Sequence, residues 1–154
     1  MLARMRWLRR KAWWGLVFMS VVVVMFGMTD IIVGSASDEG IPRGLIGLSS
    51  SELRAESEAG YRIFDFFTRS QGLVLFVLGL LSTAILLFAY RRELRWAWWT
   101  MWALPAWSAG VLILYLVAGV DPAPPPPPRM LSAPFFLVLT VAIQLVSAPR
   151  FFRQ

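Results

Sequence analysis

The sequence contains no cysteine and no histidine, and charged residues make up only 16% of its 154 positions. Without cysteine there is no disulfide, thiol redox chemistry or iron–sulfur cluster, and without histidine the usual ligand of zinc and haem is missing. Lysine is almost absent too, because Lys11 is the only one and every other basic residue is arginine. These absences exclude most metal and haem enzymes, and we expect neither a cofactor nor a metal.

Enzyme motifs are also missing from the sequence. There is no glycine-rich loop that ends in Gly-Lys-Ser or Gly-Lys-Thr, no Gly-x-Gly-x-x-Gly fingerprint and no Gly-x-Ser-x-Gly nucleophile elbow. A membrane enzyme that uses Asp30, Asp65 or Asp121 as an acid or base stays open as a minor alternative. We therefore predict that the protein is not an enzyme.

Hydrophobic residues, in contrast, make up 58% of the chain, whereas soluble domains have about 45–50%. A helix needs about 20 apolar residues to cross the hydrocarbon core of a bilayer. Four stretches are long enough: residues 13–33, 72–90, 97–120 and 130–148. Because backbone polar groups in lipid must be paired within the protein, these stretches predict an all-α fold, a bundle of four transmembrane helices in one integral membrane domain.

The distribution of arginine predicts the orientation of this bundle. Basic residues gather in the N-terminal tail, the second connection and the C-terminal tail, which share one side: Arg4, Arg6, Arg9, Arg10, Lys11, Arg91, Arg92, Arg95, Arg150 and Arg153. By the positive-inside rule both termini are cytoplasmic, and the plasma membrane of a bacterium is the simplest location. The basic side would face anionic lipid, so the lipid bilayer is the expected partner and no nucleic acid is needed to explain the charge.

Most tryptophans lie close to the same predicted boundary, where amphipathic rings favour the headgroup level. They are Trp7, Trp13, Trp14, Trp96, Trp98, Trp99 and Trp102, and only Trp107 lies deeper. We interpret the cluster beside Arg95 as an interfacial anchor, with a cation–π or anionic-lipid site as the alternative. The first apolar run is longer than the roughly 7–15 residues of a signal-peptide core, so we expect an uncleaved helix.

Residues 34–71 form the only long connection, which is expected outside. Its first half is rich in glycine and predicts an irregular loop. Ser49 and Glu52 have the spacing of a capping box, which predicts that a helix begins there. The composition turns aromatic from Tyr61, so we expect this external helix to lie along or enter the outer interface, with continuation into the second span as the alternative.

The last connection, residues 121–129, contains five consecutive prolines. Such a run adopts polyproline II, which is stiff and has no internal hydrogen bonds. We interpret the link as a rigid spacer rather than a docking site for an SH3-like module, because it is expected to face away from the cytoplasm. Another proline, Pro105, is expected to kink the third span.

Charged side chains inside or beside a bilayer are costly and are functional candidates by default. Arg62, Asp65 and Arg69 are spaced i, i+3 and i+7, which places them on one helical face and lets Asp65 pair with both arginines. Together with Asp30 and Asp121 they form the candidate outer cluster. The favoured role is a self-neutralised polar stripe that supports the fold, and the alternative is a vestibule that binds a ligand or an ion.

A polar line in the fourth span consists of Thr140, Gln144 and Ser147, at i, i+4 and i+7. Such side chains usually form hydrogen bonds to a neighbouring helix, and a substrate path is the minority alternative. Small residues in the second and third spans form faces that allow helices to approach closely. They are Gly72, Gly79, Ser82, Ala103, Ala106 and Gly110.

Three features occur together in this chain: an external segment that ends in Arg69-Ser70-Gln71-Gly72, a glycine-containing second span, and a basic-then-tryptophan turn from Arg91 to Trp96. This combination resembles small bacterial four-span membrane proteins of unknown function, some of them loosely DoxX-like. The resemblance is architectural and implies no residue role. We expect a non-enzymatic accessory or assembly component that packs against itself or a larger membrane partner. The alternative is a small homo-oligomeric transporter, channel or sensor that uses the candidate outer cluster as its vestibule.

Overall fold

A computed structural model describes residues 11–122 and 126–152. These residues form helices α2 (Trp13–Val33), α3 (Gly40–Ile46), α4 (Ser50–Glu56), α5 (Glu58–Ile85), α6 (Arg95–Thr100), α7 (Ala103–Ala118) and α8 (Pro128–Phe152), with the 3-10 turn η1 (Gly34–Ser37) and the π turn η2 (Leu86–Tyr90). No strand occurs in these described ranges. The predicted all-helical fold class is therefore confirmed.

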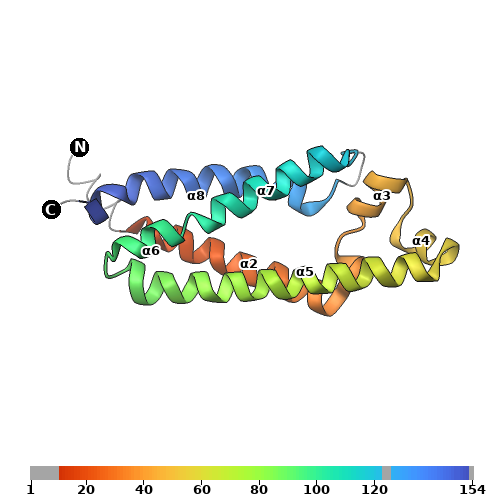
Figure 1. The fold of residues 1–154 in the computed structure, drawn as a ribbon, viewed down its shortest axis with the longest axis horizontal. Coiled ribbons are helices and arrows are strands. Elements are labelled where there is room, and N and C mark those ends of the chain that lie inside the picture. Colours follow the sequence, from red (N-terminus) through yellow and green to blue (C-terminus); the bar gives the residue numbers. More distant parts are fainter. Residues whose placement is uncertain (1–10, 123–125, 153–154) are drawn as a thin grey trace.

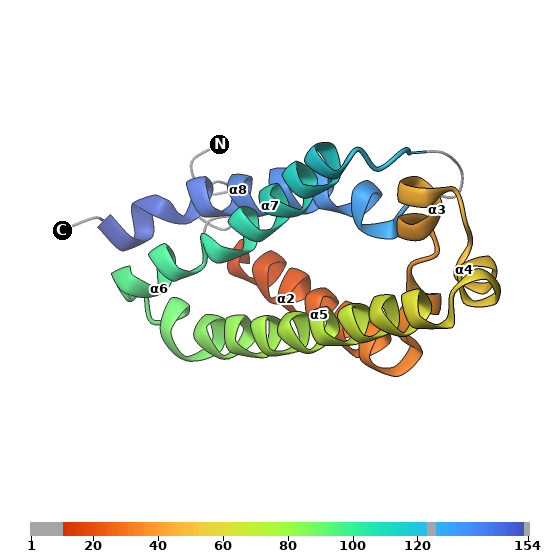
Figure 2. The ribbon, with the colours of Figure 1, turned by 45° about the vertical axis from the view of Figure 1, so that its right-hand side comes forward.

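Four helical stretches are long and apolar enough to cross a membrane: Trp13–Ser37, Glu58–Tyr90, Arg95–Ala118 and Pro128–Phe152. They confirm the prediction of a multi-pass membrane protein. Figure 1 shows that α2 lies along α5 and α7 lies along α8, so the molecule is extended in one direction. The helices α3 and α4 lie at one end, which we call the cap end, while the start of α2 and the end of α8 lie at the other, the terminal end (Figures 1 and 2).

The helices α2 and α5 pack backbone to backbone through glycine. A Cβ built on Gly79 would lie 2.8 Å from the Val24 nitrogen and 2.9 Å from the Ser20 oxygen, and one on Gly27 would lie 2.4 Å from the Phe76 nitrogen. The predicted small face of the second span, Gly72, Gly79 and Ser82, is buried and faces this contact. The small face of the third span is directed elsewhere, because Ala103 and Ala106 are exposed and a Cβ on Gly110 would meet nothing within 4 Å.

The main apolar core lies at the terminal end and includes two of the tryptophans expected in the interface. Trp13 and Trp98 are only 8% and 7% exposed, and they pack with Leu16, Leu86, Tyr90, Met101 and Phe151. These two side chains therefore face the bundle and not lipid, contrary to the expected anchor role, and the Trp98 indole also donates to the Gln144 oxygen at 3.1 Å. Trp14, Trp96 and Trp99 are more than half exposed, as an anchor requires. Trp7 lies outside the described residues.

We expected an irregular loop in the glycine-rich half of the external segment, but this half folds into η1 and α3. Glycine is used here for close packing, since a Cβ on Gly40 would lie 2.5 Å from the Pro127 nitrogen and one on Gly44 would lie 2.8 Å from the Asp121 oxygen. Gly47 ends α3 in the left-handed conformation, with φ of 73°. The helix α3 therefore packs on the last connection, both on Asp121 before the proline run and on Pro127 within it.

The predicted capping box is present at the start of α4. The Ser49 nitrogen donates to Glu52 Oε2 at 2.7 Å, the Glu52 nitrogen donates to Ser49 Oγ at 3.2 Å, and these bonds hold the pKa of Glu52 below its ordinary value. This helix ends at Glu56, and Ser57 then caps α5 by accepting a hydrogen bond from the Gly60 nitrogen at 3.1 Å. Residues 58–71 thus belong to the same helix as the predicted second span, which is the continuation that the sequence left open as the alternative.

Proline shapes the other two spans. The third span is interrupted at Met101 and Trp102, one turn before the expected kink, because Pro105 has no N–H for the Met101 carbonyl and the Leu104 nitrogen donates to it instead, at 3.3 Å. The fourth span begins at Pro128 and includes Arg129, so the last two residues of the predicted polyproline link are helical. Residues 123–125 of that link lie outside the described residues.

Candidate functional site at the cap end

The centre of the cap end is a buried ion pair between Asp30 near the end of α2 and Arg129 in the first turn of α8. Their exposed fractions are only 4% and 5%. Arg129 Nη2 donates to Asp30 Oδ2, and Ser37 Oγ donates to Asp30 Oδ1 at 2.9 Å. The pair neutralises both charges and joins the first span to the fourth.

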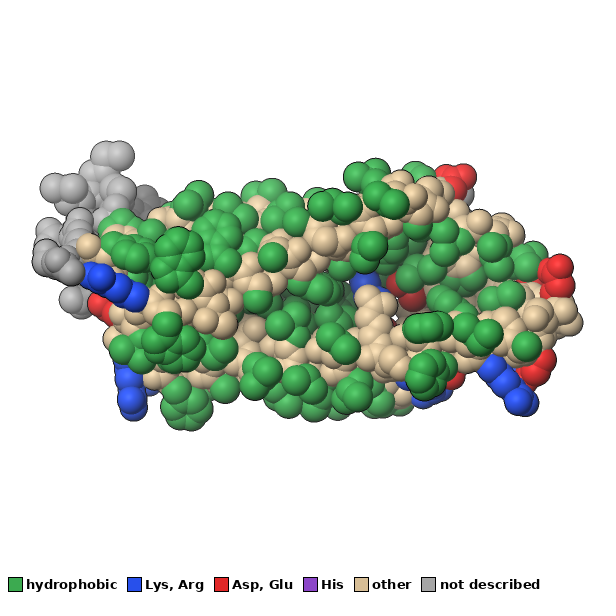
Figure 3. All heavy atoms as spheres, viewed as in Figure 1, with side chains coloured by type: hydrophobic (Ala, Val, Ile, Leu, Met, Phe, Trp, Pro, Cys, Tyr) green, Lys and Arg blue, Asp and Glu red, His purple; other side chains and the backbone are tan. Residues whose placement is uncertain are grey.

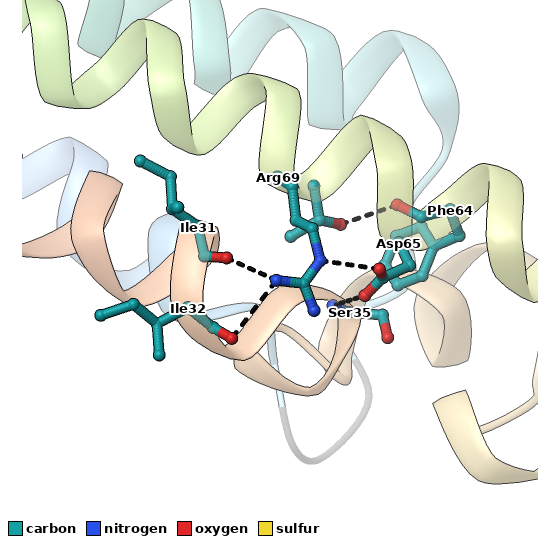
Figure 4. Close-up of polar contacts among 7 residues, drawn as sticks. Ile31, Ile32, Ser35, Phe64, Asp65 and Arg69 are labelled. Atoms are coloured by element: carbon teal, nitrogen blue, oxygen red, sulfur yellow. Dashed lines mark hydrogen bonds and ion pairs between the residues drawn. The ribbon is translucent and has the colours of Figure 1, made fainter.

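Asp65 and Arg69 form a second polar group, which we call the latch (Figure 4). Arg69 Nε donates to Asp65 Oδ2 at 2.8 Å, and Asp65 Oδ1 accepts from the Ser35 nitrogen at 2.9 Å. Arg69 Nη1 also donates to the carbonyls of Ile31 and Ile32 in the last turn of α2. These carbonyls have no partner within their own helix, so the latch caps α2 from α5.

The remaining members of the candidate outer cluster lie apart. Arg62 Nε pairs with Glu58 Oε1 at 3.1 Å and its side chain is 76% exposed, so the ladder expected around Asp65 contains only Arg69. Asp121 is exposed and its backbone nitrogen donates to the Gly44 oxygen at 2.9 Å. The structure thus places Asp65 and Arg69 in the latch and Asp30 in the buried pair, and leaves the other two members outside both. The pair also includes Arg129, which the sequence prediction had placed in the link.

A cavity of about 160 Å³ opens beside the buried pair. It is lined by Phe26, Thr29, Asp30, Ser37, Asp38, Pro128 and Arg129. In Figure 3 a basic and an acidic side chain are visible at the bottom of a hollow between the helices toward the cap end. This cavity is the largest departure from the sequence prediction, because Asp38 was not among the candidates.

Asp38 carries an uncompensated carboxylate. It is 3% exposed, and its Oδ1 has no hydrogen-bond partner in the described part of the chain. Burial raises the pKa of Asp38 from its ordinary 3.8 to about 6, although the backbone amides of Ile41 and Gly40 act in the opposite direction. The titratable groups around it are Asp30 and Arg129, which line the same cavity, and the neutral phenol of Tyr115 on α7, which interacts electrostatically with Asp38.

We expect the stability advantage of the Asp38→Asn variant over the wild type to be largest at pH 7.5 and clearly smaller at pH 4.5. A carboxyl whose pKa is raised on folding contributes stability below its unfolded pKa, and the folded state loses that stability as the pH rises through about 6. Two pKa units correspond to about 3 kcal/mol. Thermal unfolding in detergent from pH 4.5 to 7.5, followed by circular dichroism, measures the difference. Glu39→Gln, one residue away and exposed, should show no comparable trend.

The polar line of the fourth span lies fully inside the bundle and connects it to α6 and η2. Trp98 Nε1 donates to the Gln144 oxygen at 3.1 Å, and Gln144 Nε2 donates to the Trp98 oxygen at 3.3 Å. Tyr90 Oη donates to Gln144 Oε1 at 3.1 Å and shares a hydrogen bond with Ser147. Thr140 Oγ1 donates to the Phe136 oxygen. The bonds of Gln144 and Ser147 join helices as expected, whereas that of Thr140 stays within α8, and the described residues of this line include no acid or base of the kind a proton path uses.

Replacing Arg69 with methionine is expected to lower the free energy of unfolding by about 1–2 kcal/mol, because the last carbonyls of α2 and the Asp65 carboxylate lose their donor in a partly exposed site. Arg69→Lys should recover only part of this, since an ammonium lacks the planar fork that reaches several oxygens. Chemical unfolding in mixed micelles measures both variants. Arg62→Met, seven residues earlier on α5, is the control, and an equal loss there would contradict the latch.

No group of three or more acidic, histidine or cysteine residues suited to a metal ion occurs in the described ranges. The chain matches no family model, and no curated protein or solved structure resembles it significantly.

Proposed function

We propose that the protein is a non-enzymatic accessory or assembly component of a membrane, which packs against itself or against a larger membrane protein. The observation that carries the proposal is that most of the cap-end charges are used inside the chain. Asp30 and Arg129 neutralise each other, and the latch holds the end of α2 on α5. Groups engaged in this way join helices, and they are not free to move a solute.

The contact surface that we propose for the partner is the outer face of α7. Ala103 and Ala106 are exposed there, and the space next to Gly110 is open. Small residues let a second helix approach closely in lipid, where dispersion contacts replace the hydrophobic effect as the driving force. The same helix exposes Ile113, Leu114 and Val117, which would extend the contact.

We infer further that this is a bacterial plasma-membrane protein with both termini in the cytoplasm and the cap end outside. The arginine distribution supports this orientation, as does the position of the start of α2 and the end of α8 at one end of the molecule (Figure 1). The first turns of α5 would act as the external interfacial helix, with Phe66 and Phe67 exposed toward the headgroups. Cysteine placed at Ser51 should then react with an impermeant reagent from outside, and cysteine at Arg92 only after lysis.

Native mass spectrometry of protein extracted mildly from its own membrane tests the assembly role. We expect a defined complex, either of several copies or with a second protein in fixed stoichiometry. Gly110→Leu should dissociate this complex without destabilising the chain, because a Cβ added at this position meets nothing within 4 Å. Val138→Leu, on the exposed face of α8, is the matched control and should leave the complex intact. A wild type that is entirely monomeric would contradict the proposal.

The alternative is a small homo-oligomeric transporter, channel or sensor, and the cavity lined by Asp38 is the observation that favours it. Purified protein in liposomes distinguishes the two. Flux of a small solute or ion through vesicles that contain this chain alone would support the alternative, since an assembly component does not conduct by itself.

A further inference from the structure

We propose that the cap-end cavity binds a primary ammonium group, with Asp38 as the carboxylate that receives it. This site is independent of the assembly role, because it lies within one copy of the chain, between α2, η1 and α8, and away from the outer face of α7. Four properties of the cavity favour such a ligand: its charge, its hydrogen-bonding groups, its size and its position.

The charge of the cavity favours a cation. Asp30 and Asp38 line it together with one arginine, and the Arg129 guanidinium is already paired with Asp30. An ionised Asp38, which is itself only 3% exposed, therefore leaves one negative charge in the cavity without a counter-charge. Isolated buried carboxylates are costly, so a positive ligand gains more here than it would at the protein surface.

The hydrogen-bonding groups favour a donor with several N–H bonds. The Ser37 hydroxyl already donates to Asp30 Oδ1 at 2.9 Å, and the Thr29 hydroxyl donates to the Met25 oxygen at 3.0 Å. Both oxygens retain lone pairs that can only accept, and Asp38 Oδ1 accepts nothing from the described residues. These three acceptors match the three N–H donors of a primary ammonium group.

The size and walls of the cavity argue against a bare metal ion. A volume of about 160 Å³ exceeds what a single ion fills, and the apolar side chains of Phe26 and Pro128 form part of the wall. An aromatic face and a carbon wall suit a short alkyl chain attached to the ammonium. A divalent ion is disfavoured as well, because Arg129 lies beside the two carboxylates and repels it.

Two sources could supply this group: a free primary amine, or the headgroup of an ethanolamine lipid. The cavity lies at the cap end, where the first candidate span finishes at residue 37 and the fourth begins at residue 128. Thr29, which lines it, is exposed on the surface of α2. A headgroup at the membrane boundary could therefore enter from the side. The raised pKa of Asp38, about 6, further implies that binding at pH 7.5 weakens strongly at pH 5, where this carboxyl is protonated.

The test uses the full chain in detergent and ethanolamine hydrochloride as the probe, with isothermal titration calorimetry at pH 7.5 and pH 5. We expect binding at pH 7.5 that is at least tenfold weaker in Asp38→Asn, within twofold of wild type in Glu39→Gln, and at least tenfold weaker for the wild type at pH 5. No binding, equal binding by Asp38→Asn, or equal displacement by potassium chloride would each overturn the proposal. The comparison of the wild type at two pH values remains decisive if a variant does not fold.

Nanodiscs separate the two sources. If the headgroup is the natural ligand, native mass spectrometry should show that the wild type retains phosphatidylethanolamine over phosphatidylcholine, whose quaternary ammonium has no N–H donor, and that Asp38→Asn loses this preference. Ethanolamine binding without any lipid preference would assign the site to a free amine. If the protein neither binds ethanolamine nor prefers phosphatidylethanolamine, the proposal is overturned. The assembly role is not affected by that result, because it is tested separately, by the subunits found in the extracted complex.

Discussion

The Arg129→Met variant is expected to lose about 3–5 kcal/mol of folding free energy, because it leaves the Asp30 carboxylate buried without its counter-charge. Asp30 is 4% exposed and keeps only the Ser37 hydroxyl as a partner among the described residues. The loss should appear as a large fall in the midpoint of chemical unfolding and as less protein in the membrane fraction. Arg43→Met, which breaks an exposed pair with Glu39 at the same end, should cost about 1 kcal/mol or less.

A double variant shows whether the stability lost in Arg129→Met comes from the unpaired charge of Asp30 or from lost packing of the arginine side chain. Asp30→Leu combined with Arg129→Met removes both charges and keeps similar volumes, so it should recover most of the stability that Arg129→Met loses. If the double variant were as unstable as the single one, the guanidinium would contribute through packing instead of charge. A cost for Arg129→Met no larger than that for Arg43→Met would contradict the burial of the pair.

The sequence predicts features of this fold that depend on neighbouring residues. The apolar run from Trp13 to Val33 is bounded by charge and glycine, and α2 has these same limits. The Ser49–Glu52 box and the spacing of Asp65 and Arg69 are likewise local, because a helix alone brings such residues together. Hydropathy marks the apolar part of the second span but does not show where its helix starts, because the Ser57 cap, and not the first apolar residue, decides where α5 begins.

Contacts between distant parts of the chain could not be predicted from local patterns. Asp30 and Arg129 are 99 residues apart, and the only sequence signal for their pairing is that a buried carboxylate in a membrane requires a cation. A glycine in the sequence can likewise indicate either a loop or a place where two backbones pack closely. Gly40 and Gly44 belong to the second kind, and the sequence alone does not show this. From sequence alone, the indole of Trp98 could face the membrane interface or form a hydrogen bond inside the bundle. It does the second, because the Gln144 backbone oxygen lies within reach of its N–H.

The largest steric effect is expected at the crossing of α2 and α5. Gly79→Ala should destabilise the fold by about 1–3 kcal/mol, because the added methyl would lie under 3 Å from backbone atoms of Val24 and Ser20, which cannot rotate away as a side chain can. Gly79→Leu should lower the amount of folded protein further. Thermal and chemical unfolding of the purified chain measure both variants.

Gly110→Ala is the matched control for this prediction. Both glycines lie inside apolar helices, so alanine should favour the helix at each position by the same ~1 kcal/mol, and only the steric contribution differs between them. With nothing within 4 Å of its Cβ, Gly110→Ala should be neutral or stabilising in the isolated chain. If Gly79→Ala were stabilising as well, α2 and α5 would not be in backbone contact, and the position of Asp30 opposite Arg129, which depends on the path of α2, would also be in error.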